Sequence, residues 1–190
     1  METVDTGLLH YVIDARTSRF TVQAFATGIL SAMGHNPKID IRSFSGEMNF
    51  NPETAEGGGL RLKMQANSLS VLDDISDKDR REMERIMNEQ VLEMAKYPDI
   101  LYEASIASIQ RLENALYSAT LDGNLSFHGV TRTQPVTARI VELGEMLRAS
   151  GEFTLRQSDY GIKPISVAGG AMKVKDELRF SFEMIARKSQ

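Results

Sequence analysis

Cysteine is absent from the sequence, which excludes disulfide bonds, thiolate nucleophiles and thiolate metal sites. This absence fits any cellular compartment. Lysine and arginine are not concentrated in any stretch of the chain, and the formal net charge is -4 at pH 7. The chain therefore lacks the basic surface of a nucleic-acid-binding protein, and we expect no nucleic-acid partner.

Long apolar runs are also missing. No stretch of about 18 apolar residues is present, so we expect no transmembrane segment. The first eleven residues are polar and acidic apart from Leu8 and Leu9, and they lack the basic start and apolar run of a signal peptide. The expected location is the cytoplasm, or the periplasm if a leader has been removed.

The usual motifs of catalysis and phosphate binding do not occur. There is no Gly-x-Ser-x-Gly sequence, and no Lys-Ser or Lys-Thr follows the glycines at 57–59. The acidic residues Asp73, Asp74, Asp77 and Asp79 lack the spacing of a calcium loop and fit the solvated start of a helix better. We expect no catalytic residue, no cofactor and no bound metal.

The three histidines, His10, His35 and His128, lie far apart in the sequence, each near the end of a predicted strand. A metal site or a general base is the functional interpretation. Turn or capping histidines are the simpler interpretation, because no carboxylate or second histidine lies at ligand spacing. An enzyme that acts on an apolar substrate through His35 or His128 is kept as an alternative.

Alternation of apolar and polar residues dominates what is present. In Gly59–Asn67 and again in Leu178–Arg187, every second side chain is apolar. A period of two predicts strands with one buried face, and many such strands favour an antiparallel sheet that closes on itself. With 190 residues, 42% of them hydrophobic, the chain is expected to form one domain over residues 1–190.

Ten strands are predicted from this pattern. In the third, Ile39 and Ile41 have the opposite parity to Phe44 and Met48, so a bulge is expected near residues 42–43. The predicted strands are Leu9–Ala15, Arg19–Thr27, Lys38–Phe50, Gly59–Asn67, Ile100–Ile109, Ala115–Phe127, Thr133–Val141, Glu145–Leu155, Gly170–Lys175 and Leu178–Arg187.

One helix is predicted, over Asp77–Met94, with Ser76 as its N-cap and Tyr97-Pro98 ending the helical region. The segment Ser68–Tyr97 is the longest excursion between predicted strands, and such excursions are often lids. We expect the helix to cover one mouth of a barrel as a lid, and a helix on the outer wall is the alternative. Its apolar stripe consists of Met83, Ile86, Met87, Val91 and Met94.

Five short motifs are spread over nearly the whole chain. The longest is Leu121–Val136, LDGNLSFHGVTRTQPV, which is similar to the pattern L-x-G-x-L-T-(I/L)-x-G-V-T-(R/K)-x-V. The others are Tyr11–Asp14 with Ser18, Phe44–Gly46, Lys96–Pro98 with Ile100, and Ser158–Ile162. In these motifs and their order the sequence resembles the YceI-like family over nearly its whole length, with Tyr102 where phenylalanine is usual in that family.

This resemblance implies an all-β fold, an antiparallel closed lipocalin-like β-barrel of about eight main strands with one inserted α-helix. It also implies non-covalent binding of a polyisoprenoid or another long-chain apolar small molecule, for storage, transport or sequestration. A filled barrel that serves as an interaction protein is a further alternative, and a homodimer is left open. The inward-facing side chains expected to bind the ligand are Phe20, Val22, Phe44, Met48, Phe50, Leu62, Met64, Ile100, Tyr102, Leu125, Phe127, Phe153, Phe180, Phe182 and Met184.

Overall fold

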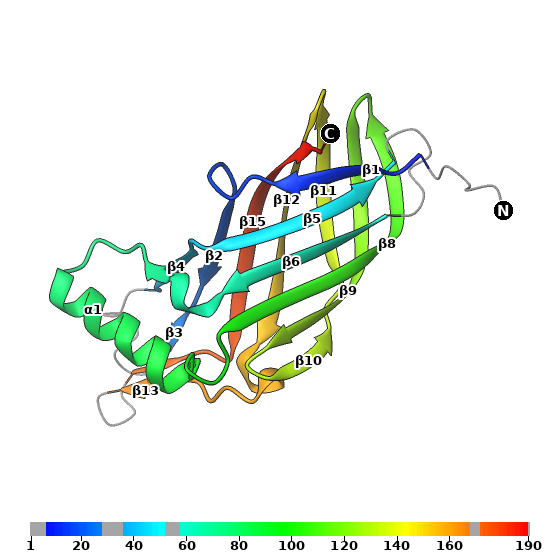
Figure 1. Cartoon of the computed structure of the whole chain (residues 1–190). Coiled ribbons are helices and arrows are strands. Elements are labelled where there is room, and N and C mark those ends of the chain that lie inside the picture. Colours follow the sequence, from blue (N-terminus) through cyan, green and yellow to red (C-terminus); the bar gives the residue numbers. More distant parts are fainter. Residues whose placement is uncertain (1–6, 28–35, 52–57, 168–171, 190) are drawn as a thin grey trace.

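Eight antiparallel strands close into a barrel in the computed structural model, which describes residues 7–27, 36–51, 58–167 and 172–189 (Figure 1). Pairing of the last of these strands with the first closes the ring, which confirms the predicted fold class. In order around the barrel they are β1 (Leu9–Ile13), β5 (Phe44–Phe50), β6 (Gly59–Gln65), β8 (Asp99–Glu113), β9 (Leu116–Phe127), β11 (Val136–Leu143), β12 (Met146–Arg156) and β15 (Glu177–Lys188).

Three shorter strands extend the sheet at one end of the barrel. β2 (Arg19–Gln23) pairs with β15, β4 (Lys38–Ile41) with β2, and β7 (Leu69–Val71) with β4. They continue β1, β5 and β6 past interruptions at residues 14–18, 42–43 and 66–68. The second interruption confirms the irregularity that the parity of the isoleucines predicted.

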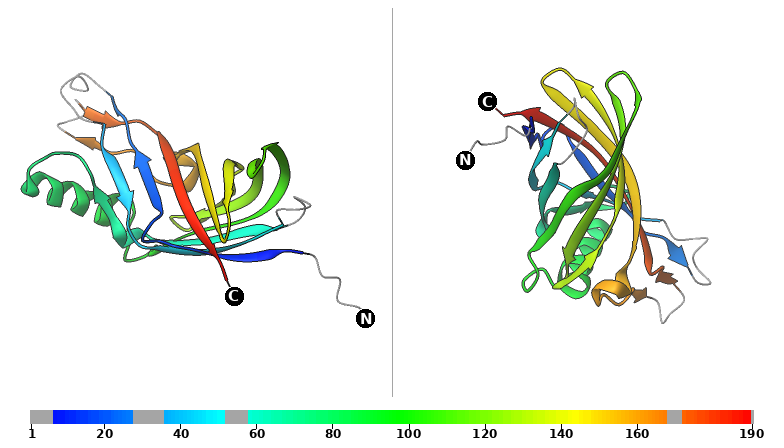
Figure 2. Two further views of the ribbon diagram at one scale, coloured as in Figure 1. Left: turned by 90° about the horizontal axis from the view of Figure 1, so that it is seen from above. Right: turned by 90° about the vertical axis from the view of Figure 1, so that its right-hand side faces the viewer.

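The remaining strands complete the ends of the barrel. β10 (Val130–Thr133) forms a hairpin with β9, and β3 (Ala26–Thr27), β14 (Met172–Val174) and β13 (Ser166–Val167) form a separate small sheet. The small sheet and the helix α1 (Asp77–Ile86) lie at one end of the barrel, and the tips of the β8–β9 and β11–β12 hairpins lie at the other (Figures 1 and 2).

The helical region is shorter than the sequence predicts. Ser76 caps α1, because its hydroxyl accepts a hydrogen bond from the Asp79 N–H at 3.1 Å. A π-helical turn, η3 (Met87–Val91), follows, and Glu93 then takes a positive φ of 43°. The prediction that the helix runs to Met94 and is ended by Tyr97-Pro98 is therefore wrong. Within the described residues, no helix has both the length and the apolar character needed to cross a membrane.

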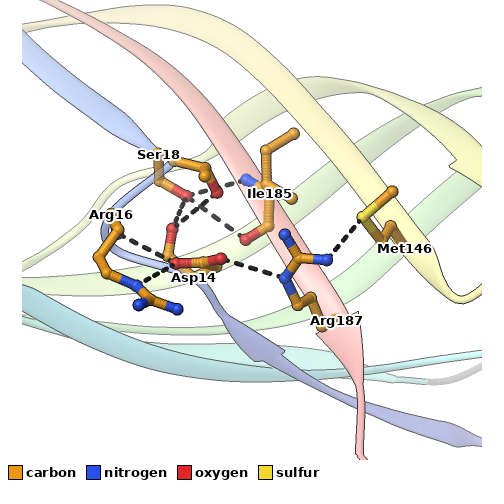
Figure 3. A network of polar contacts seen from close by, with 7 residues as sticks. Asp14, Arg16, Ser18, Met146, Ile185 and Arg187 are labelled. Atoms are coloured by element: carbon orange, nitrogen blue, oxygen red, sulfur yellow. Dashed lines mark hydrogen bonds and ion pairs between the residues drawn. The ribbon is translucent and has the colours of Figure 1, made fainter.

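A polar network holds the barrel together where β1 gives way to β2 (Figure 3). The Ser18 hydroxyl accepts from the Ile185 N–H at 2.9 Å and donates to the Asp14 carbonyl at 2.8 Å. Arg187 donates to the Asp14 carboxylate at 3.1 Å, and this hydrogen bond is the main reason why the pKa of Asp14 lies below its ordinary value. The network gives the backbone of β15 a hydrogen-bond partner at the point where the neighbouring strand is interrupted.

We expect Ser18→Ala to lower the free energy of unfolding by about 1–3 kcal/mol, because it leaves the half-buried Ile185 N–H without its hydrogen-bond partner. Denaturant unfolding measures the change. Thr17→Ala in the same loop is the matched control, since the Thr17 hydroxyl makes only a long, exposed hydrogen bond of 3.4 Å. Equal stability of the two variants would contradict this role of Ser18.

Candidate functional site: an apolar cavity in the barrel

A cavity of about 460 Å³ occupies the end of the barrel that carries α1 and the small sheet. We call it the outer cavity. Its walls come from the barrel strands, from β2, β4 and β7, and from the helical region. Alternation along these strands turns the apolar side chains inward, so the wall is almost entirely apolar. Eight of the predicted ligand-binding residues line it: Phe20, Val22, Met64, Ile100, Leu125, Phe127, Phe153 and Phe180.

A second, much smaller cavity of about 50 Å³ lies deeper in the barrel, and we call it the inner cavity. Along β15, Phe180 lines the outer cavity and Phe182 lines the inner one. Along β12, Leu155 lines the outer cavity and Ala149 lines the inner one. The two cavities are therefore stacked along the barrel axis. The predicted residues that line the inner cavity without reaching the outer one are Met48, Leu62, Tyr102, Phe182 and Met184.

Beyond the inner cavity the barrel is filled with side chains. Phe50 and Tyr117 are fully buried there, and their rings meet edge to face with centroids 5.5 Å apart. Tyr11 and Leu147 are 1% and 0% exposed. Among the described residues, the free volume therefore lies toward the end that carries α1, and the opposite end is filled. Among the predicted ligand-binding residues, Phe44 and Phe50 are buried but line neither cavity.

The helical region borders the outer cavity. Met83, Ile86, Met87 and Val91 of the predicted stripe line it, whereas Met94 packs against the buried core without lining it. Met87, Val91 and Leu92 of the π-helical region all line the cavity, although Leu92, five residues after Met87, would lie off the shared face of Met87 and Val91 in a regular α-helix.

Polar side chains of α1 hold the helix against β7. The Glu84 carboxylate accepts from the Val71 N–H at 2.9 Å and from the Ser70 hydroxyl at 3.0 Å. Arg80 donates to the carbonyl of Val71 and, at 2.9 Å, to that of Asp73. The bonds to the N–H and the carbonyl of Val71 satisfy backbone groups of β7 that a neighbouring strand would otherwise pair.

Asp73 and Gln157, two polar residues that line the outer cavity, have structural partners. The Asp73 carboxylate accepts from the Lys38 N–H at 3.0 Å, and the buried Gln157 amide donates to the Lys175 carbonyl at 2.9 Å. Tyr102, which lines the inner cavity, donates to the Gln134 carbonyl at 2.9 Å. Burial raises the pKa of Tyr102 to about 12, so its hydroxyl remains a hydrogen-bond donor at neutral pH. These hydrogen bonds fix the walls of the cavities.

The histidines lie away from both cavities where the structure describes them. His128 occupies the β9–β10 turn with φ 51°, donates from Nδ1 to the Tyr160 carbonyl at 3.1 Å, and has Nε2 3.1 Å from Glu93. It thereby links the turn to the end of the helical region. His10 lies 3.3 Å from Glu47 on the surface, and His35 falls outside the described residues. Across the described ranges, no three histidine or carboxylate side chains gather as metal ligands would.

Sequence reasoning identified the part of the wall that β2 supplies, through Phe20 and Val22, but not the part that β4 and β7 supply. β7 was not predicted, because three residues after a 3₁₀ turn give too short a pattern to count as a strand. The isoleucines of β4 could have indicated this part of the wall, because their alternation places them on one face of the strand. The wall residues missed in this part of the cavity include Ile39, Ile41, Leu69, Val71 and Ile75.

Comparison with solved structures supports the fold. BcnA of Burkholderia cenocepacia has a TM-score of 0.67 at 16% identity, with 91% of this chain and 98% of that chain covered. A structure described as a polyisoprenoid binding domain from Saccharophagus degradans, implicated in plant cell wall breakdown, has a TM-score of 0.67 at 13% identity, with 95% and 99% covered. The YCEI protein of Campylobacter jejuni has a TM-score of 0.60 at 17% identity, with 83% and 88% covered.

Sequence comparison supplies the family. No curated protein matches the chain. A family model described as the YceI-like domain matches residues 11–186, which is most of the chain and includes every segment whose motifs suggested the resemblance. The chain therefore belongs to the YceI-like family.

Proposed function

We propose that this protein binds a long apolar lipid of the isoprenoid type non-covalently, in the outer cavity, for storage, transport or sequestration. The observation that carries the proposal is the cavity itself, which is almost wholly apolar. Its volume of about 460 Å³ falls within the roughly 300–1,000 Å³ that is typical of small-molecule sites. The description of the similar Saccharophagus degradans domain as polyisoprenoid binding supports the choice of lipid.

Burial of hydrocarbon supplies the affinity in this proposal. Each methylene group removed from water contributes about 0.8 kcal/mol, so a chain of several isoprene units outweighs the cost of ordering both ligand and protein. Aromatic and methionine side chains in the wall suit a flexible, branched chain, because methionine adapts its shape to irregular neighbours. Binding needs no catalytic group.

Native mass spectrometry of the protein as purified tests the proposal, followed by titration of the delipidated protein with farnesol. We expect either a co-purified lipid or saturable binding of farnesol at one molecule per chain. A linear diol of similar length is the matched control, since polar groups at both ends oppose burial. A protein that carries no lipid and binds no prenyl alcohol would contradict the proposal.

We further propose that the helical region acts as a lid over the outer cavity. Its side chains line the cavity, and it is held to β7 by side-chain hydrogen bonds. A lid controls the rate at which ligand enters and leaves. A helix that only covers the wall would contribute to stability and leave these rates unchanged.

Met87→Ala distinguishes these roles. We expect release of a fluorescent prenyl analogue to become several-fold faster while the melting temperature falls by only a few degrees, because Met87 is half-buried and faces the cavity. Stopped-flow release and thermal unfolding measure the two effects. Arg81→Ala, on the exposed side of α1, is the control. A destabilised Met87→Ala with the wild-type release rate would rule out the lid.

A further inference from the structure

We infer that Phe20, Met64, Leu125 and Phe153 form a floor across the barrel that limits how far an apolar chain can enter. These four residues are the ones that line both the outer and the inner cavity, so they separate the two. The inference rests on the proposed function, because it concerns the length of the lipid that the outer cavity holds. It identifies the residues that would set chain-length specificity.

The floor is complete because its members come from strands spaced around the barrel. Met64 lies on β6, Leu125 on β9, Phe153 on β12 and Phe20 on β2. Going around the barrel, β8 lies between Met64 and Leu125, β11 between Leu125 and Phe153, and β15 between Phe153 and Phe20. The chain of β4 and β5 lies between Phe20 and Met64. Each side chain points to the barrel interior, so together they close it at one level.

Packing holds part of the floor rigidly. Phe20 is 4% exposed, stacks on Phe182 with ring centroids 5.8 Å apart, and meets Phe44 edge to face at 5.4 Å. Phe153 is only half-buried and stacks on Phe180 at 4.9 Å, on the side of the outer cavity. Phe153 is therefore the member whose removal opens the floor with the least damage to the barrel.

The volumes on the two sides of the floor define the expected ligand. A cavity of about 150 Å³ can bind benzene, which has six carbons, so about 460 Å³ holds roughly 18 carbons. This corresponds to a chain of three to four isoprene units. The inner cavity of about 50 Å³ is too small for even one benzene-sized group. The outer cavity thus fits a short isoprenoid, and a longer chain leaves carbons outside the mouth.

Methionine methyl groups report directly on how deep a chain reaches. Met83 and Met87 line the outer cavity only, and Met48 and Met184 the inner cavity only. We would label the protein with methyl-¹³C methionine, assign the signals with single Met→Leu variants, and titrate it with geranylgeraniol, which has four isoprene units. In the wild type, the signals of Met83 and Met87 should shift, and those of Met48 and Met184 should stay in place.

Phe153→Ala should let the chain pass the floor, so that the Met48 and Met184 signals also shift on addition of geranylgeraniol. Phe180→Ala is the matched control, because it enlarges the outer cavity without removing a member of the floor. If Phe153→Ala does not fold, Phe153→Leu makes a smaller opening in the same place, and the wild-type titration by itself still tests the floor.

The outcomes separate the two proposals. If no methionine signal of the wild type responds to the alcohol, the proposed function fails. If the alcohol binds and the Met48 and Met184 signals already shift in the wild type, the floor does not exist, although lipid binding stands. The floor is also overturned if a folded Phe153→Ala or Phe153→Leu binds the alcohol and the inner methionine signals remain unshifted.

Discussion

Replacement of Met64 by glutamate should abolish prenyl-ligand binding and lower the free energy of unfolding by about 3–5 kcal/mol. Met64 is 6% exposed, lines both cavities and belongs to the floor. Its pairing with Phe44 and Ile100 on neighbouring strands leaves apolar groups on both sides. A carboxylate at this position would lie between apolar neighbours in an almost entirely apolar cavity, which is a costly environment for a charge.

The pH dependence of this variant provides a second test. Burial raises the pKa of a carboxylic acid, so the folded variant should bind a proton at a pH where the unfolded chain is still ionised. The loss of stability is then complete above the folded pKa and shrinks as the pH falls through it. Gln65→Glu is the matched control, because the next side chain on β6 is exposed. Denaturant unfolding across pH values and a fluorescence titration measure both effects, and wild-type affinity in Met64→Glu would place the ligand elsewhere.

Phe50→Ala should cost about 3–5 kcal/mol of stability and leave ligand affinity unchanged. Phe50 is 0% exposed, and its ring packs edge to face against Tyr117 at the filled end of the barrel. Truncation removes both the buried surface and the aromatic pair and leaves a void that rigid strands cannot close. Unlike Met64→Glu, Phe50→Ala should leave ligand binding intact, because Phe50 lies outside both cavities.

Chemical unfolding and titration of the folded variant with a fluorescent prenyl analogue check this expectation. Asn49→Ala on the same strand is the control, since Asn49 is exposed and should tolerate the change. A folded Phe50→Ala with weakened ligand affinity would show that the ligand reaches the filled end. Stability equal to that of the control would show that the filled end contributes little to the barrel.

Strand parity made much of the wall predictable from the sequence. Along β15, Phe180, Phe182 and Met184 alternate with Arg179, Ser181 and Glu183, and the structure places the first set at the cavities. This succeeds because side-chain direction in a strand is a local property of the backbone. The start of the helix was predictable for a similar reason. Ser76 caps it by a hydrogen bond with the N–H of Asp79, only three residues further along the chain, so the signal is local.

The end of the helix and the short strand β7 were harder to predict from the sequence. The helical region ends with the π turn at Met87–Val91, but apolar residues continue to Met94, so the apolar pattern does not mark its end. β7 exists because β4 lies beside it and because Glu84 and Arg80 bind its other edge. None of these partners is close enough in the sequence to leave a local signal.

The sequence alone determined which side chains face inward, the strand-rich fold and the membership in the family that its motifs suggested. Only the tertiary structure decided which inward side chains line a cavity and which fill the barrel. The alternation along their strands predicts that both Phe50 and Phe182 face inward. In the structure Phe50 packs against Tyr117, whereas Phe182 lines the inner cavity. The physical reason is that parity depends on neighbouring residues, whereas free volume depends on side chains that approach from strands on opposite sides of the barrel.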